Sequence, residues 1–144
     1  MNIKIVSVGK IKNKPFLSLT SEYIKRIRRY AAIELLEIKD SNREEECSRL
    51  ASIVEKEKGY SIALSEDGRE LSSREFASHL SGIHRKIVLV IGGPDGLTEE
   101  FKRQTDMVMS LSRMTFPHEM ARMLLSEQVF RALNILNGGK YHND

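Results

Sequence analysis

The chain has 144 residues, of which 40% are hydrophobic and 30% charged. This length and composition predict one globular domain over residues 1–144 and exclude a disordered or collagen-like chain. The single cysteine, Cys47, has no partner for an internal disulfide and no second sulfur ligand for a structural zinc site. No apolar run approaches the roughly 20 residues of a membrane span, and the N-terminus lacks the pattern of a signal peptide. We therefore expect a cytoplasmic protein with no membrane association and no metal.

The net charge of +3 conceals an uneven distribution. Residues 1–30 contain one acid, Glu22, and eight bases: Lys4, Lys10, Lys12, Lys14, Lys25, Arg26, Arg28 and Arg29. A basic region suits a polyanionic partner, because each phosphate that it neutralises releases counterions. From charge alone, a solvated basic face without any partner is an equally good interpretation.

Strand and helix patterns alternate from the N-terminus. An apolar run over residues 3–8 predicts a strand that stops at Gly9, and Pro15 opens a helix to about Arg29 with apolar residues spaced three and four apart. The next predicted elements are a strand over 33–38, a charged helix over 42–58 and a brief strand over 60–64.

The second half continues the alternation. Ser72 and Glu75 form a capping box that starts a helix ending near Gly82. Residues 87–91 are five consecutive aliphatic residues, which indicates a central parallel strand buried on both faces. Thr98 is the expected N-cap of the next helix, and a short strand over 106–111 and a long helix to about residue 137 follow. This order predicts an α/β fold, a mostly parallel sheet flanked by helices.

Two loops in the last third are candidates for ligand binding. Gly92-Gly93-Pro94-Asp95-Gly96-Leu97 follows the buried strand, matches neither a P-loop nor a dinucleotide fingerprint, and would let a ligand approach the backbone closely. Open α/β sheets bind ligands at the carboxyl ends of their strands, although a tight turn explains the glycines equally well. The loop over 111–116 follows the next strand, so main-chain groups of both loops are expected to hold an adenosine-like group.

The last helix and the tail after it are also unusual. One stripe of the helix is apolar, further apolar residues lie beside it, and a symmetric dimer is the simplest explanation, with burial in the chain's own core as the alternative. These residues are Ala121, Leu125, Val129, Leu133 and Leu136 on the stripe, and Met120, Met123, Leu124 and Phe130 beside it. In the tail, Tyr141 and His142 offer a stacking ring and a group that titrates near neutrality, which suits holding and deprotonating a nucleobase. A frayed terminus without a role is the alternative.

Several motifs occur together in a characteristic order. They are Val8-Gly9-Lys10, Ile91-Gly92-Gly93-Pro94-Asp95-Gly96-Leu97, Ser112-Arg113-Met114-Thr115-Phe116-Pro117-His118, Glu127-Gln128-Val129-Phe130-Arg131-Ala132 and Tyr141-His142. With these motifs the chain closely resembles, over essentially its whole length, the RlmH type of ribosomal RNA methyltransferase in the SPOUT class.

The resemblance implies methyl transfer from S-adenosyl-L-methionine to N3 of a pseudouridine in 23S rRNA, with the assembled 70S ribosome as substrate. It also implies a homodimer with the SPOUT fold and a C-terminal trefoil knot. The cofactor contacts carried over by position are Leu64, Gly92, Leu111, Ser112, Arg113, Met114, Thr115 and Phe116. His142 is expected to be the base or to stabilise the developing anion, and Tyr141 to position the uracil ring. Asn143 departs from the family, in which a basic residue commonly follows the histidine.

Two other functions are compatible with the same residues. One is a SPOUT-fold RNA-binding or ribosome-assembly factor that keeps the pocket but transfers no methyl group. The other is a SPOUT methyltransferase that acts on another RNA base, although such enzymes often carry an additional RNA-binding domain.

Overall fold

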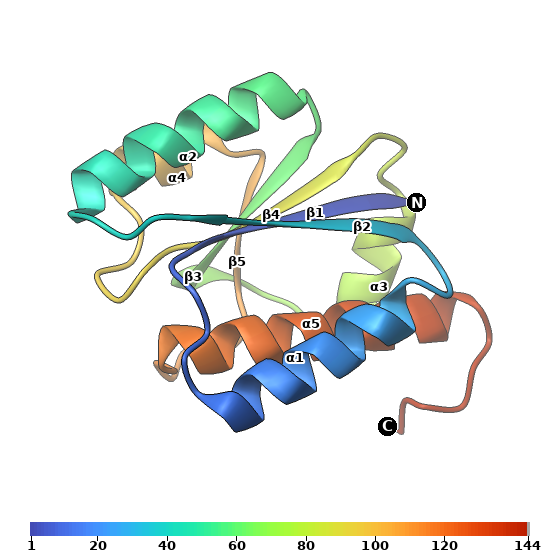
Figure 1. Ribbon diagram of the computed structural model, residues 1–144. Helices are drawn as coiled ribbons and strands as arrows, with labels where there is room; N and C mark the ends of the chain where they lie inside the picture. The colour runs from blue at the N-terminus through green and yellow to red at the C-terminus, as the bar shows by residue number, and fades with distance from the viewer. Residues whose placement is uncertain (144) are drawn as a thin grey trace.

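The computed structural model describes residues 1–143. In this range, five parallel strands form one sheet in the order β2-β1-β4-β3-β5, and five helices flank it (Figure 1). The strands are β1 (Asn2–Val8), β2 (Ala32–Ile38), β3 (Tyr60–Glu70), β4 (Ile87–Ile91) and β5 (Met107–Ser110). The helices are α1 (Lys14–Ile27), α2 (Arg43–Glu57), α3 (Ser73–Ser81), α4 (Glu99–Gln104) and α5 (His118–Leu136). The predicted α/β fold is confirmed.

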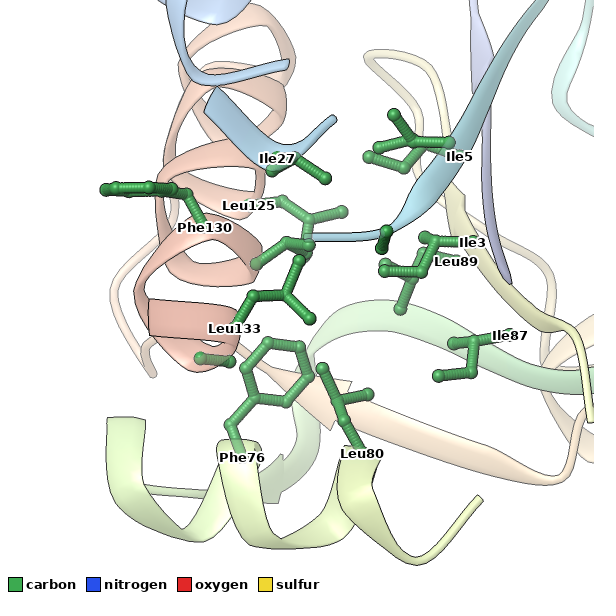
Figure 2. Close-up of a cluster of buried hydrophobic side chains, with 14 of the residues drawn as sticks. Ile3, Ile5, Ile27, Phe76, Leu80, Ile87, Leu89, Leu125, Phe130 and Leu133 are labelled. Atoms are coloured by element: carbon green, nitrogen blue, oxygen red, sulfur yellow. The ribbon is translucent and has the colours of Figure 1, made fainter. Parts of the chain in front are cut away.

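The sheet separates two hydrophobic clusters. Helices α2 and α4 cover one face, and α1, α3 and α5 cover the other (Figure 1). On the second face, side chains of β1 and β4 point toward those of α3 and α5 (Figure 2). β4 lies in the centre of the sheet with all five residues buried, as its continuous aliphatic run predicts.

The third strand is longer than predicted, and this correction matters for the site. β3 does not end at Leu64 but continues to Glu70, with an irregularity opposite Met109 of β5. Both Leu64 and Arg69 pair with Met109, so residues 65–68 bulge out of the ladder. The Ser-Glu-Asp-Gly sequence has the composition of a turn, which is why the sequence pattern placed the strand end there.

Both ends of α1 also differ slightly from the prediction. α1 begins one residue before Pro15, because the side chain of Asn13 accepts a hydrogen bond from the Phe16 amide at 3.0 Å, and it ends at Ile27. Thr98 caps α4 and the Ser72–Glu75 capping box begins α3, both as predicted. Within residues 1–143, no helix is long and apolar enough to cross a bilayer. The trefoil knot stays a prediction, because strand order alone does not establish how the chain threads.

Candidate active site

A pocket of about 240 Å³ lies at the carboxyl ends of β4 and β5 and beside the bulge of β3, which pairs with both strands. Open α/β sheets place ligand sites at this edge. The glycine loop after β4 forms one wall, and the loop after β5 forms another. The glycine loop and the loop after β5, which are separate in sequence, therefore meet at one site.

The glycine loop is folded by its own backbone. The Gly96 amide donates to the Gly93 carbonyl at 2.9 Å, which closes a turn over Pro94 and Asp95, and Gly96 has a φ of +75°. A Cβ on Gly92 would lie 2.9 Å from the carbonyl carbon and oxygen of Gly96. Only glycine fits at position 92, so the loop can fold back closely on itself beside the pocket.

The loop after β5 is held by its serines. The Ser110 hydroxyl donates to the Ser112 carbonyl at 2.8 Å, and the Ser112 hydroxyl accepts from the Met114 amide at 3.0 Å. Seven of the eight predicted cofactor residues line the pocket: Leu64, Gly92, Leu111, Ser112, Met114, Thr115 and Phe116. Arg113 is the exception, since its side chain is 82% exposed and pairs with Glu70. That the seven bind a cofactor stays a prediction.

The bulge in β3 adds two pocket residues that the sequence did not indicate, Ser65 and Glu66. Lys102 of α4 holds this bulge, with its ammonium 3.0 Å from the Asp67 carboxylate. Hydrogen bonds from the Ser65 hydroxyl and from Lys102 lower the pKa of Asp67, so the carboxylate stays ionised and keeps its partners. Such a bulge is difficult to recognise because it depends on the pairing of β3 with β5 across 45 residues of sequence.

Polar contacts fix the amino end of α5 beside the pocket. The Glu119 carboxylate accepts hydrogen bonds from the amides of Lys12 and Asn13, both at 2.9 Å, and these bonds lower the pKa of Glu119. Arg122 is buried, donates to the Gly9 carbonyl at 3.0 Å and pairs with Glu37. The segment after β1 and the first turns of α5 are thereby held together.

The tail folds back onto the other end of α5, and its contacts there define the tail cluster: Tyr23, Glu127, Phe130, Arg131, Asn134, Tyr141 and His142. The Tyr141 amide donates to Asn134 Oδ1 at 3.1 Å, and its hydroxyl donates to Glu127 at 3.2 Å. The ring lies edge-on to Phe130 with centroids 4.8 Å apart, and the guanidinium of Arg131 lies 4.7 Å from the ring centroid. These contacts show an anchored tail in place of a frayed end.

Tyr141 is an anchor with a weakly acidic hydroxyl. Burial raises its pKa well above the usual value, and the neighbouring hydroxyl of Tyr23 and the negative charge of Glu127 raise it further. The hydroxyl is therefore neutral at physiological pH and acts as a hydrogen-bond donor to Glu127.

Within one chain, the tail cluster does not meet the pocket. His118 lines the pocket, whereas Tyr141 contacts Glu127, Phe130 and Asn134 further along the same helix. At 1.5 Å per helical residue, these contacts lie about 14–24 Å from His118 along the helix axis. Figure 1 shows residues 137–143 leaving the end of α5 opposite to the loop after β5. The two sets of predicted site residues thus form two separate places in each protomer.

The basic N-terminal region is only partly available to a partner. Lys4 lies between Glu57 and Glu34 on the sheet, and Arg26 pairs with Glu22 at 3.1 Å. The other six bases are exposed: Lys10, Lys12, Lys14, Lys25, Arg28 and Arg29. Among residues 1–143, no three His, Cys, Asp or Glu side chains are grouped so that they could hold a metal ion.

A match to a family of known proteins defines the class of this chain. A family model described as "Predicted SPOUT methyltransferase" matches residues 1–142, and the chain belongs to this family. Its fold is similar to that of tRNA (m1G37) methyltransferase from Aquifex aeolicus, with a TM-score of 0.63 at 16% identity over 100% of this chain and 76% of that one.

Closer relatives define the branch of the family. The chain is 41% identical to ribosomal RNA large subunit methyltransferase H of Caldicellulosiruptor bescii, over 97% of this chain and 99% of that protein. It is 39% identical to the protein of the same name in Coprothermobacter proteolyticus, over 99% of both chains. These matches place the chain in the RlmH group of SPOUT methyltransferases and confirm the resemblance drawn from its motifs.

Proposed function

We propose that this protein transfers a methyl group from S-adenosyl-L-methionine to N3 of a pseudouridine in the 23S rRNA of the assembled 70S ribosome, in the cytoplasm. The observation that carries the proposal is the pocket, in which seven residues expected from the RlmH resemblance come together at the ends of β4 and β5 and the bulge of β3. The curated relatives named ribosomal RNA large subunit methyltransferase H support the class of substrate.

The residues of the pocket fit this methyl donor. The closely folded glycine loop with Gly92 forms one wall, and apolar side chains such as Leu64, Leu111 and Phe116 line the same cavity. An adenosine group needs such a combination of apolar walls and main-chain hydrogen-bonding groups. When bound, S-adenosyl-L-methionine supplies a methyl group already activated by a positively charged sulfur.

The remaining chemistry falls to the protein. The two loops hold the donor in place, and correct alignment of reactants is worth several kcal/mol in general. The N3 proton is weakly acidic and has to leave, so a group that accepts it or stabilises the resulting anion is required. We assign this role to His142 and assign Tyr141 to positioning the uracil ring.

Because tail and pocket lie apart in one protomer, the proposal requires a homodimer in which the tail of one chain completes the pocket of the other. Exposed apolar side chains support this arrangement: Met114 on the rim of the pocket is 75% exposed, and Leu17, Leu19 and Leu136 on α1 and α5 are also exposed. A symmetric dimer buries the same patch on both subunits. The exposed bases of residues 10–29 then contact rRNA phosphates.

The first experiment is transfer of tritiated methyl groups to 70S ribosomes, free 50S subunits and protein-free rRNA, all from cells that lack the enzyme. Mass spectrometry then identifies the modified nucleoside. We expect methylpseudouridine, with 70S ribosomes far better than naked RNA. Methyl transfer to another base would replace the proposed target, and donor binding without transfer to any substrate would support an RNA-binding or assembly factor.

A mixing experiment tests the shared site. Gly92→Ala disables the pocket, and His142→Ala disables the tail. At a donor concentration near the wild-type Kd, each homodimer is expected to be strongly impaired, whereas mixed dimers contain one intact pocket facing one intact tail and regain activity. If the mixture stays inactive although mass spectrometry shows mixed dimers, or if ultracentrifugation shows a monomer, the shared site is wrong.

A further inference from the structure

The contact between Arg131 and His142 determines which ring nitrogen carries a proton. Nη1 of Arg131 lies 3.0 Å from Nδ1 of His142. A guanidinium has only donors, so in this contact Nδ1 must be the acceptor. This contact therefore requires the tautomer of His142 in which the proton is on Nε2.

Arg131 is itself fixed in place, so the contact does not depend on a mobile side chain. Its Nε and Nη2 donate to Glu127 Oε1 at 2.8 and 2.6 Å, and its guanidinium lies over the ring of Tyr141. The side chains of Arg131 and Glu127 are only 22% and 13% exposed. Glu127, Arg131 and His142 form a chain of contacts that starts on α5 and ends in the tail.

We propose that Arg131 is a positioning residue that holds His142 as the Nε2–H tautomer, so that His142 donates a hydrogen bond to a carbonyl oxygen of the target ring. This inference rests on the proposed function and decides between the two roles open to His142. With the Nδ1 lone pair engaged by Arg131 and a proton on Nε2, the ring has no lone pair left to accept the N3 proton.

In this arrangement the N3 proton leaves without a protein base. The N3–H bond breaks, the proton goes to water, and its electron pair stays in the ring, where the charge spreads to the two flanking carbonyl oxygens. The Nε2–H of His142 donates to one of these oxygens. That hydrogen bond strengthens as the charge develops, which lowers the barrier to deprotonation.

The tautomer can be measured without any catalysis. ¹⁵N NMR on the full-length protein distinguishes the two nitrogens of a neutral imidazole, and the spectrum of His142→Gln assigns His142 among the four histidines. We expect the Nε2–H form in the wild type and a mixture of both tautomers in Arg131→Met. The Nδ1–H form in the wild type, or an unchanged His142 signal in Arg131→Met, would overturn the proposal.

Kinetics on 70S ribosomes tests the role of the donor. The amide nitrogen of glutamine reaches about as far as Nε2, and that of asparagine reaches about as far as Nδ1. We expect His142→Gln to retain at least tenfold more of kcat than His142→Asn or His142→Ala. Arg131→Met is expected to lose about tenfold in kcat with an unchanged Kd for the donor, and Arg131→Lys to recover part of it.

The outcomes separate this inference from the proposed function. If the wild type methylates pseudouridine but His142→Gln is as slow as His142→Ala, donation from Nε2 is wrong and the function stands. If the wild type transfers no methyl group, the function fails, and the NMR result still shows whether Arg131 selects the tautomer.

Discussion

The pocket and the tail cluster lie at opposite ends of α5 and are held together by different kinds of contact. Near His118, the pocket lies between two loops that are folded by local contacts, with Gly92 packed closely on Gly96 and the Ser112 hydroxyl bonded within its own loop. Near Asn134, the tail cluster consists of side chains that contact other side chains, such as Tyr141 with Glu127. A closely packed loop is disturbed by added atoms, whereas a cluster built from side chains is disturbed by removed ones. We therefore expect the pocket to be most sensitive to substitutions that add atoms and the tail cluster to those that remove them.

The largest effect is expected from Gly92→Ala. The added Cβ would lie 2.9 Å from the backbone of Gly96 and 3.0 Å from Leu97 Cδ2, so the glycine loop has to shift. Overpacking of this kind costs about 1–3 kcal/mol, and the Kd for S-adenosyl-L-methionine should rise roughly 10- to 100-fold. Isothermal titration calorimetry measures this change.

Gly82→Ala is the matched control, because its added Cβ would meet only the His79 carbonyl at an ordinary 3.6 Å. We expect it to leave donor binding unchanged. If Gly92→Ala binds the donor as tightly as Gly82→Ala does, the backbone of the glycine loop does not form the donor site.

The opposite failure is expected from Asn134→Ala at the tail. The buried Asn134 accepts from the Tyr141 amide at 3.1 Å and donates to the Tyr30 hydroxyl at 3.2 Å. Losing both bonds should destabilise the fold by about 1–2 kcal/mol and, by releasing the tail, reduce methyl transfer about tenfold. The Kd for the donor should not change.

Asn137→Ala is a suitable control for this variant. Asn137 lies at the same end of α5, and its side chain donates at 2.7 Å to the carbonyl of Leu133, which is not a member of the tail cluster. A loss of transfer that is equal in both variants would show that the end of the helix matters and the anchored tail does not.

These two regions also differ in how far the sequence predicted them. The pocket could be predicted from the sequence because its loops follow apolar strands, and parallel strands bring their carboxyl ends to one edge of the sheet. The bulge with Ser65 and Glu66 was missed because the pairing of β3 with β5 resumes after a turn-like sequence. The separation of Tyr141 from the pocket was also missed, because motifs that occur in order along a sequence do not show how far apart their residues lie in the folded chain. The i,i+4 spacing of Glu127 and Arg131 was the one local signal of the tail cluster.

A smaller effect is expected from the titration of Tyr141. Its pKa is raised in the folded state, so above about pH 10 the unfolded chain loses this proton first and the free energy of unfolding falls with rising pH. For this half-buried ring the loss between pH 10 and 11 is at most about 1 kcal/mol, since water screens part of the effect.

In Tyr141→Phe this component is absent, so its stability should decline less steeply over the same pH range. Urea denaturation at several pH values measures both slopes. Parallel curves for wild type and variant would show that the hydroxyl of Tyr141 is not held in the anchored tail.

The smallest effect is expected from Arg113→Ala, although Arg113 lies between two pocket residues in sequence. Its side chain is 82% exposed and pairs with Glu70, itself 61% exposed, so this ion pair contributes at most about 1 kcal/mol. The loop around it is folded by the Ser112 hydroxyl and the Met114 amide, which the substitution leaves in place. The Kd for S-adenosyl-L-methionine should therefore change less than about twofold. A change of tenfold or more in calorimetry would mean that the guanidinium turns into the pocket when the donor binds.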